Sequence, residues 1–196
     1  MLMKKKSFVR FVFTFILLFL IFYYFFVTII AVTAPGGYYS SFIDHYFNII
    51  AWLKQSLING SGFLLKMAGY ETYTLDNFII RLVNGKGVRI AHDCSGHGII
   101  SFWLAYILSI DLPLKKRLYW LFGGLILLWM INVTRISLLI LALNKNWPMP
   151  LNIDHHDWFN IISYLFIFVM IFFLDKMSNK VDKSGSSDSK VNPNIY

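Results

Sequence analysis

The stretch "LYWLFGGLILLWMINVTRISLLILAL", residues 118–143, decides the fold class, because it is apolar apart from a few small polar side chains and one charge. At about 1.5 Å per residue, a helix of this length crosses a hydrocarbon core of roughly 30 Å. Arg135 is the single charged residue in it. A charged side chain inside a membrane helix costs free energy. It is therefore expected at a functional site, where another group pairs with the charge. The stretch therefore predicts a membrane-spanning helix with a functional arginine.

Three further runs predict membrane helices in the same chain: Phe11–Val32, Ser95–Ile110 and Trp158–Leu174. The composition agrees, since 57% of the residues are hydrophobic and only 14% are charged. The first run follows a basic N-terminus, as in a signal peptide, but it is longer than the apolar core of a signal peptide, about 7–15 residues. We therefore expect an all-α polytopic membrane protein with about four transmembrane helices, the first of them a retained anchor.

Basic residues predict the orientation of these helices, because lysine and arginine concentrate in cytoplasmic loops. One basic cluster, Lys4–Arg10, precedes the first helix. A second, Lys115–Arg117, lies between the second and third helices, and a third, Lys176–Lys190, follows the fourth. Four crossings place all three clusters in the cytoplasm, together with both termini. The net charge of +8 is then explained by membrane topology, so we expect a cell-membrane protein without a nucleic-acid partner.

The segment between the first two helices, residues 33–94, is then extracytoplasmic. Apolar residues recur at helical spacing within 42–57, and Lys54 falls on the other face of that helix. This pattern predicts a helix that lies in the outer interface of the membrane. A membrane crossing within 42–69 remains an open alternative.

A β-hairpin and a polar tail complete the predicted architecture. The stretch "NFIIRLVNGKGVRIA", residues 77–91, contains two β-rich runs joined across Asn84–Gly87, and it leads directly to Cys94. Residues 1–175 are expected to form a single membrane domain. Residues 176–196 are rich in Lys, Ser, Asp and Asn, which predicts a disordered cytoplasmic tail.

Three polar groups are expected in one layer at the outer face of the membrane. The stretch "RIAHDCSGHG", residues 89–98, holds the single cysteine of the chain, Cys94, just outside the second helix. Arg135 lies roughly 27 Å along a helix that starts at Arg117, close to the outer boundary of the hydrocarbon core. The stretch "NIDHHDWF", residues 152–159, precedes the fourth helix at the same boundary.

Cysteine, arginine and histidine together suit nucleophilic acyl transfer. A thiolate attacks a carbonyl carbon, and nearby cations or a helix N-terminus favour the thiolate. Cys94 stands where a helix is expected to begin, with Ser95 and Gly96 in its first turn. A histidine can carry a proton to the leaving amine, and a fixed guanidinium can stabilise the oxyanion. Asn132 lies one helical turn from Arg135 on nearly the same face.

In their order and placement, these motifs resemble the exosortase/archaeosortase family. "CSG" (94–96) opens a membrane helix after a β-like stretch, "NVTRI" (132–136) lies at the outer end of a later helix, and "HHD" (155–157) precedes another. The resemblance runs from about Lys66 to Leu174. The chain is shorter than the many-span exosortases, so it resembles a compact branch of this family of membrane cysteine transpeptidases.

The resemblance implies a role for each matching residue. Cys94 resembles the nucleophile, Arg135 the catalytic arginine and His156 the third catalytic residue. The supporting candidates are Asn132, Ser95, Gly96, Asp157 and His155. Because the two histidines are adjacent, the choice between them stays open. Family members commonly have a glycine a few residues after this histidine, where this chain has Asn160.

The family also implies a substrate class. Its members act on proteins that end in a sorting signal, which consists of a short motif, a transmembrane helix and a basic cluster. They cut near the motif at the outer face of the membrane through a thioester, and they transfer the acyl group to an amine or to water. The expected partners are therefore membrane-anchored substrate proteins and the lipid bilayer. No cofactor is expected.

Two other classes of function remain as alternatives. A metal-dependent membrane hydrolase would draw its ligands from two clusters of possible donors: His92, Cys94, His97, Asp154, His155, His156 and Asp157. The sequence lacks the H-E-x-x-H pattern, and these donors follow no recognised ligand spacing, which argues against this class. A non-catalytic membrane assembly subunit is the third class, and there the thiol of Cys94 would be dispensable.

Overall fold

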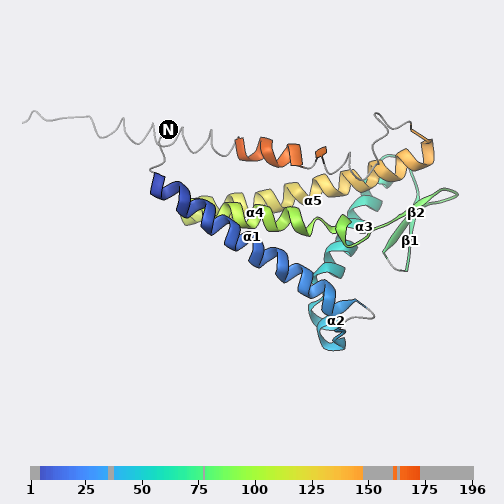
Figure 1. The fold of residues 1–196 in the computed structure, drawn as a ribbon. Helices are drawn as coiled ribbons and strands as arrows, with labels where there is room; N and C mark the ends of the chain where they lie inside the picture. Colours follow the sequence, from blue (N-terminus) through green and yellow to red (C-terminus); the bar gives the residue numbers. More distant parts are fainter. Residues whose placement is uncertain (1–4, 35–37, 77, 148–160, 163, 173–196) are drawn as a thin grey trace, which may run out of the picture. The chain divides into compact units, whose positions relative to one another are not determined.

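The computed structural model describes residues 5–34, 38–76, 78–147, 161–162 and 164–172 (Figure 1). Contacts divide the chain into two units, residues 1–152 and 153–196. In the second unit, residues 161–162 and 164–172 are helical, within the predicted fourth membrane helix. The predicted tail, residues 176–196, lies outside the described residues. All helices and strands named below belong to the first unit.

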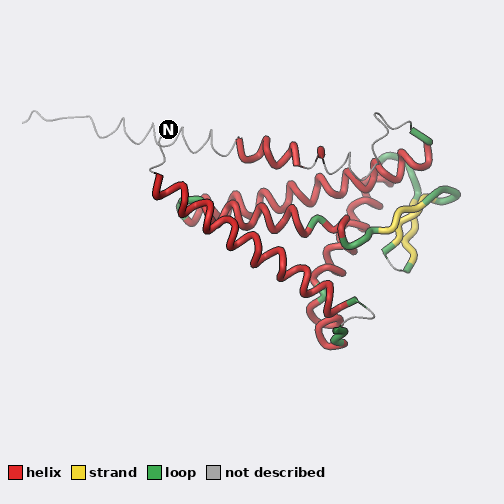
Figure 2. Tube along the Cα trace, viewed as in Figure 1, coloured by secondary structure: helices red, strands yellow, loops and turns green. Residues whose placement is uncertain are grey.

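Helices make up most of the described first unit (Figure 2). Helix α1 spans Lys5–Thr33 and helix α5 spans Leu114–Lys145, and each is long and apolar enough to cross a membrane. Helix α4, His97–Ser109, is apolar but has only 13 residues, about 20 Å of helix. It is therefore shorter than a hydrocarbon core of roughly 30 Å. Two of the described helices are long and apolar enough to span a membrane, and the predicted count of four stays a prediction.

Aromatic side chains pack α1 against α4. Phe15 meets Phe102 edge to face with ring centroids 5.2 Å apart, and Phe11 meets Tyr106 in the same way at 6.3 Å. Such pairs contribute about 0.5–1.5 kcal/mol beyond the burial of their area. Other large apolar side chains of α1 are exposed, Phe13 among them at 68%. An exposed aromatic surface of this kind suits contact with lipid hydrocarbon.

Two helices occupy the segment for which one interfacial helix was expected. Helix α2 spans Ser41–Phe47 and helix α3 spans Ile49–Met67. They are separated at Asn48, whose side-chain oxygen accepts a hydrogen bond from the backbone N–H of Ala51 at 2.8 Å and so caps α3. The prediction that Lys54 lies away from the buried face of this helix was wrong. Lys54 is only 4% exposed, because it lies on the face that α3 buries against the rest of the unit.

Small residues bring α3 close to α5. A Cβ atom added at Gly60 would lie 2.8 Å from side-chain atoms of both Trp129 and Val133. Trp129 donates its indole N–H to the hydroxyl of Ser56 at 3.1 Å, and Ser61 donates to the carbonyl of Val133 at 3.3 Å. Small residues and interhelical hydrogen bonds are typical of helix pairs in membranes. These contacts fix the rotation of α5 about its own axis, and thereby the direction of its polar side chains.

A three-stranded antiparallel sheet connects α3 to α4. Its strands are β1 (Thr72–Leu75), β2 (Ile79–Leu82) and β3 (Gly87–Arg89), in the order β1-β2-β3. Strands β2 and β3 lie within the stretch 77–91, for which a hairpin was predicted, and β3 begins at Gly87, the last residue of the expected turn. Strand β1 was not anticipated, because a run of four residues carries little periodicity of its own.

The sheet is fixed to the helices at its turn and on one face. At the turn, Asn144 of α5 accepts a hydrogen bond from the backbone N–H of Lys86 at 2.6 Å and donates one to the carbonyl of Lys86 at 3.1 Å. Ile80 of β2 and Ile90, which directly follows β3, are each 1% exposed and belong to the same apolar cluster as Ile136 of α5. The chain therefore leaves β3 from a fixed position.

Candidate active site

Cys94 lies in a short 3₁₀ turn, Asp93–Ser95, between the sheet and α4. The backbone N–H of Ser95 donates to the carbonyl of His92 at 3.0 Å and closes this turn. Gly96 then adopts a φ of +79°, a conformation that side chains with a Cβ rarely adopt, and α4 starts at the next residue. Cys94 is therefore presented by a turn that is held by β3 on one side and by a helix on the other.

Two residues of α5 lie near this turn. Asn132 donates from its Nδ2 atom to the backbone carbonyl of Cys94 at 3.2 Å. Arg135 is 6% exposed and lies close enough to Cys94 for an electrostatic interaction between them. Residues three apart share one face of a helix, so a single face of α5 brings both side chains to Cys94. The structure therefore brings two of the sequence-predicted residues, Asn132 and Arg135, near Cys94.

The thiol itself is largely enclosed. Cys94 is 6% exposed and belongs to the apolar cluster that includes Leu57 of α3 and Ile136 of α5. A low local dielectric strengthens the attraction between a thiolate and a guanidinium compared with water. The surroundings of Cys94 therefore combine apolar packing with a nearby guanidinium, that of Arg135.

Ser95 and His97 form a buried polar pair next to Cys94. The hydroxyl of Ser95 and the Nδ1 atom of His97 are 3.1 Å apart, and the two residues are 1% and 8% exposed. The ring of His97 lies 5.9 Å from that of Tyr23 of α1, centroid to centroid. The hydroxyl of Ser101 donates to the carbonyl of His97 at 2.8 Å. This pair joins the turn of Cys94 to α1 and α4.

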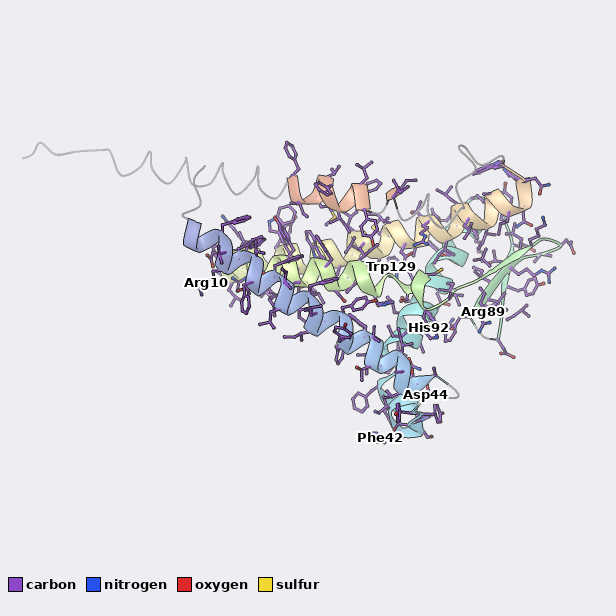
Figure 3. The ribbon with its side chains drawn as sticks, in the orientation of Figure 1. Arg10, Phe42, Asp44, Arg89, His92 and Trp129 are labelled. Atoms are coloured by element: carbon purple, nitrogen blue, oxygen red, sulfur yellow. The ribbon has the colours of Figure 1, made fainter. Side chains whose placement is uncertain are left out.

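Lys54 also lies near this turn, although its sequence pattern predicted a position away from the buried face of its helix. Its Nζ atom lies 3.2 Å from Nδ1 of His92 and 5.0 Å from the centroid of the Phe78 ring. His92 precedes the turn that carries Cys94 (Figure 3). The signal in the sequence was the spacing of Lys54 from Leu57 and Ile58, three and four residues on, which places all three on one helical face.

The second histidine-containing motif lies outside the described residues. His155, His156 and Asp157, with Asp154 before them, are all in this segment. The structure therefore neither places these residues near Cys94 nor separates them from it. Among the described residues, no group of three or more His, Cys, Asp or Glu side chains could hold a metal ion.

The family of the chain follows from its match to a known family model. The model of the transmembrane exosortases matches residues 5–174, from the start of α1 to the end of the predicted fourth membrane helix. The chain belongs to the transmembrane exosortase family. This confirms the resemblance drawn from "CSG", "NVTRI" and "HHD". Exosortases are membrane-embedded proteins and generally cysteine transpeptidases, so the apolar surfaces of α1 and α5 are those of a membrane protein. No curated protein and no solved structure gives a significant match.

Proposed function

We propose that this exosortase is a cysteine transpeptidase that cleaves C-terminal sorting signals of exported proteins at the outer face of the cell membrane. The observation that carries the proposal is the hydrogen bond from Asn132 of α5 to the Cys94 carbonyl, together with Arg135 on the same face of α5, close enough to Cys94 for an electrostatic interaction. The chain separates the cysteine from these residues by a whole helix and a loop. Such convergence, in a chain with a single cysteine, is expected of a nucleophile and is not required for packing alone.

The proposed reaction begins with attack of the Cys94 thiolate on a carbonyl carbon of the substrate. The guanidinium of Arg135 stabilises the charge that develops on the carbonyl oxygen. The carbon–nitrogen bond of the peptide then breaks, a thioester to Cys94 remains, and His156 delivers a proton to the leaving amine. An acceptor amine or water attacks the thioester, releases the thiolate, and completes transfer or hydrolysis.

A membrane-embedded site suits a substrate that is itself anchored. A transmembrane helix in the substrate holds the adjacent cleavage motif at a fixed depth, so the motif meets a site that is also at fixed depth. This arrangement reduces the search for a productive geometry, because the two partners already share an orientation. The basic cluster of the sorting signal stays on the cytoplasmic side by the same rule that orients the enzyme.

The proposal is tested by trapping the thioester. The enzyme is co-expressed with a reporter that ends in a motif, an apolar helix and a basic cluster, taken from a protein encoded near it. We expect a reporter fragment joined to Cys94, which mass spectrometry detects and hydroxylamine releases. Fragment release with no such adduct, in a reaction that chelators stop, would favour a metal-dependent hydrolase instead.

The proposed topology makes its own prediction, because it rests on the basic clusters alone. Single cysteines introduced into a Cys94→Ser background near Lys86 and Asn152 should react with a membrane-impermeant thiol reagent in intact cells. Those introduced near Lys116 and Lys183 should react only after the membrane is permeabilised. Labelling of the Lys116 position in intact cells would contradict the topology and, with it, an extracytoplasmic site.

The adjacent histidines give a matched pair for the proton-transfer step. We expect His156→Ala to abolish processing of the reporter and His155→Ala to leave substantial activity, because Asp157 follows His156 and is available to orient it. Both variants should reach the membrane in equal amounts, as measured by immunoblot. The reverse result would assign proton transfer to His155 and leave the roles of Cys94 and Arg135 unchanged.

A further inference from the structure

The orientation of the Asn132 amide is fixed by its partner. The backbone carbonyl of Cys94 can only accept a hydrogen bond, so the atom of Asn132 that faces it at 3.2 Å must be the nitrogen. The oxygen, Oδ1, therefore points elsewhere. Oδ1 is buried and accepts no hydrogen bond within the described part of the chain.

A buried carbonyl oxygen without a donor is unusual, since nearly all buried polar atoms in proteins are paired. Leaving such an atom unpaired destabilises a fold, and the hydrogen bond that Nδ2 donates to Cys94 does not remove this penalty for Oδ1. An asparagine at this position is therefore explained best if a donor reaches Oδ1 during function. The location of Asn132, next to Cys94, favours a donor on the molecule that Cys94 attacks.

Asn132 and Arg135 offer complementary hydrogen-bonding groups to a peptide. A guanidinium only donates, so Arg135 suits the carbonyl oxygen of a peptide and cannot bind its N–H group. The free oxygen of Asn132 only accepts, so it suits that N–H group. The two residues are three apart on α5, which places their Cβ atoms about 5–6 Å apart on one face.

We infer that Asn132 has two functions: its Nδ2 atom holds the Cys94 carbonyl in place, and its Oδ1 atom binds a backbone N–H group of the peptide substrate beside the carbonyl that Cys94 attacks. The inference rests on the proposed function, because it takes Cys94 as the nucleophile. It adds a site that recognises the backbone of the substrate. This site does not depend on a pocket for a substrate side chain. Such a site binds peptides with little regard to their side chains.

Gly96 keeps Asn132 in this position. A Cβ atom at Gly96 would lie 2.9 Å from Nδ2 of Asn132, closer than real Cβ contacts allow. The positive φ of Gly96 adds a second reason why a side chain is unfavourable there. A larger residue at 96 would therefore displace the amide of Asn132 from the Cys94 carbonyl.

The test uses small thiol reagents, because the chain has a single cysteine and the Cys94 side chain is 6% exposed. The purified full-length enzyme in detergent micelles is alkylated with 2-iodoacetamide, which carries N–H groups, and with N,N-dimethyl-2-iodoacetamide, which carries none. Each rate is divided by the rate of the same reagent with glutathione. We expect the wild-type enzyme to prefer the N–H reagent by about threefold to tenfold, the value of one hydrogen bond.

Two substitutions separate the two functions of Asn132. Asn132→Ala should lose the preference for the N–H reagent and also react more slowly. Asn132→Asp keeps an accepting oxygen but loses the donor to Cys94 and adds a negative charge, so it should keep the preference while its pH profile of alkylation moves to higher pH. The matched control is Thr134→Ala, an exposed residue of the same helix, which should behave as wild type in both measurements.

Equal rates of the two reagents in wild type, or an undiminished preference in Asn132→Ala, would overturn the inference. A variant that fails to fold is recognised by its elution in gel filtration, and Asn132→Asp then carries the test through its rate and pH profile. These results are independent of catalysis, because they report only the surroundings of the thiol. A failure of the proposed function would instead appear as normal processing by an enzyme that lacks the thiol.

Discussion

Replacement of Cys94 by alanine or serine is expected to lower the rate of sorting-signal cleavage by roughly a hundredfold or more, which corresponds to about 2.7 kcal/mol in the transition state. Alanine removes the nucleophile. Serine leaves a hydroxyl that is almost wholly protonated near neutral pH, at a site whose groups are suited to a thiolate. Uncleaved reporter should therefore accumulate in both variants, as measured by immunoblot.

The control for this experiment is the amount of each variant in the membrane, which shows whether the turn that carries residue 94 still folds. Cys94 is packed in an apolar cluster, so alanine leaves a small cavity there while serine nearly preserves the volume. Both variants should reach the membrane at wild-type levels. Near-normal cleavage by Cys94→Ala would exclude the thioester mechanism. Cleavage that remains but is sensitive to chelators would point to a metal-dependent hydrolase, and a phenotype independent of cleavage would point to an assembly subunit.

The location of Arg135 shows what helix geometry alone can predict. The apolar run of α5 and the rise per residue of a helix predict that Arg135 lies near the level of Cys94. Such a prediction is possible because a helix rises by a fixed distance per residue. In an uninterrupted membrane helix, the number of residues from one end therefore gives the depth of a residue in the membrane. The rotation of α5 could not be predicted in the same way, because it depends on Gly60 and Trp129, which meet across the α3–α5 contact.

The buried location of Lys54 and the existence of strand β1 could not be predicted from the sequence. The location of Lys54 depends on which face of α3 is buried, and lysine in an amphipathic pattern normally indicates the polar face. Its contacts with His92 and Phe78, which lie far along the chain, reverse that expectation. Strand β1 is stabilised by pairing with β2, so its four residues show their structure only when the partner strand is known.

Replacement of Arg135 by lysine is expected to lower the cleavage rate at least about a hundredfold, the effect of removing a donor that stabilises an oxyanion. Lysine retains the positive charge, but an ammonium group is a point charge and does not reproduce the planar fork of guanidinium donors. It also ends short of the position that the guanidinium occupies. The readout is again the accumulation of uncleaved reporter at equal enzyme levels.

Two further variants distinguish the charge of Arg135 from its geometry. Arg135→Ala removes both, so iodoacetamide should alkylate Cys94 more slowly than in Arg135→Lys, where a cation still favours the thiolate. Cleavage should be strongly impaired in both, because neither offers the guanidinium fork. The matched control is Arg117→Lys, since Arg117 lies in the first turn of α5 and donates to the carbonyl of Ile110, a full helix length from the turn of Cys94. If Arg135→Lys cleaved the reporter as fast as this control, Arg135 would contribute only its charge, and oxyanion stabilisation would have to come from other donors.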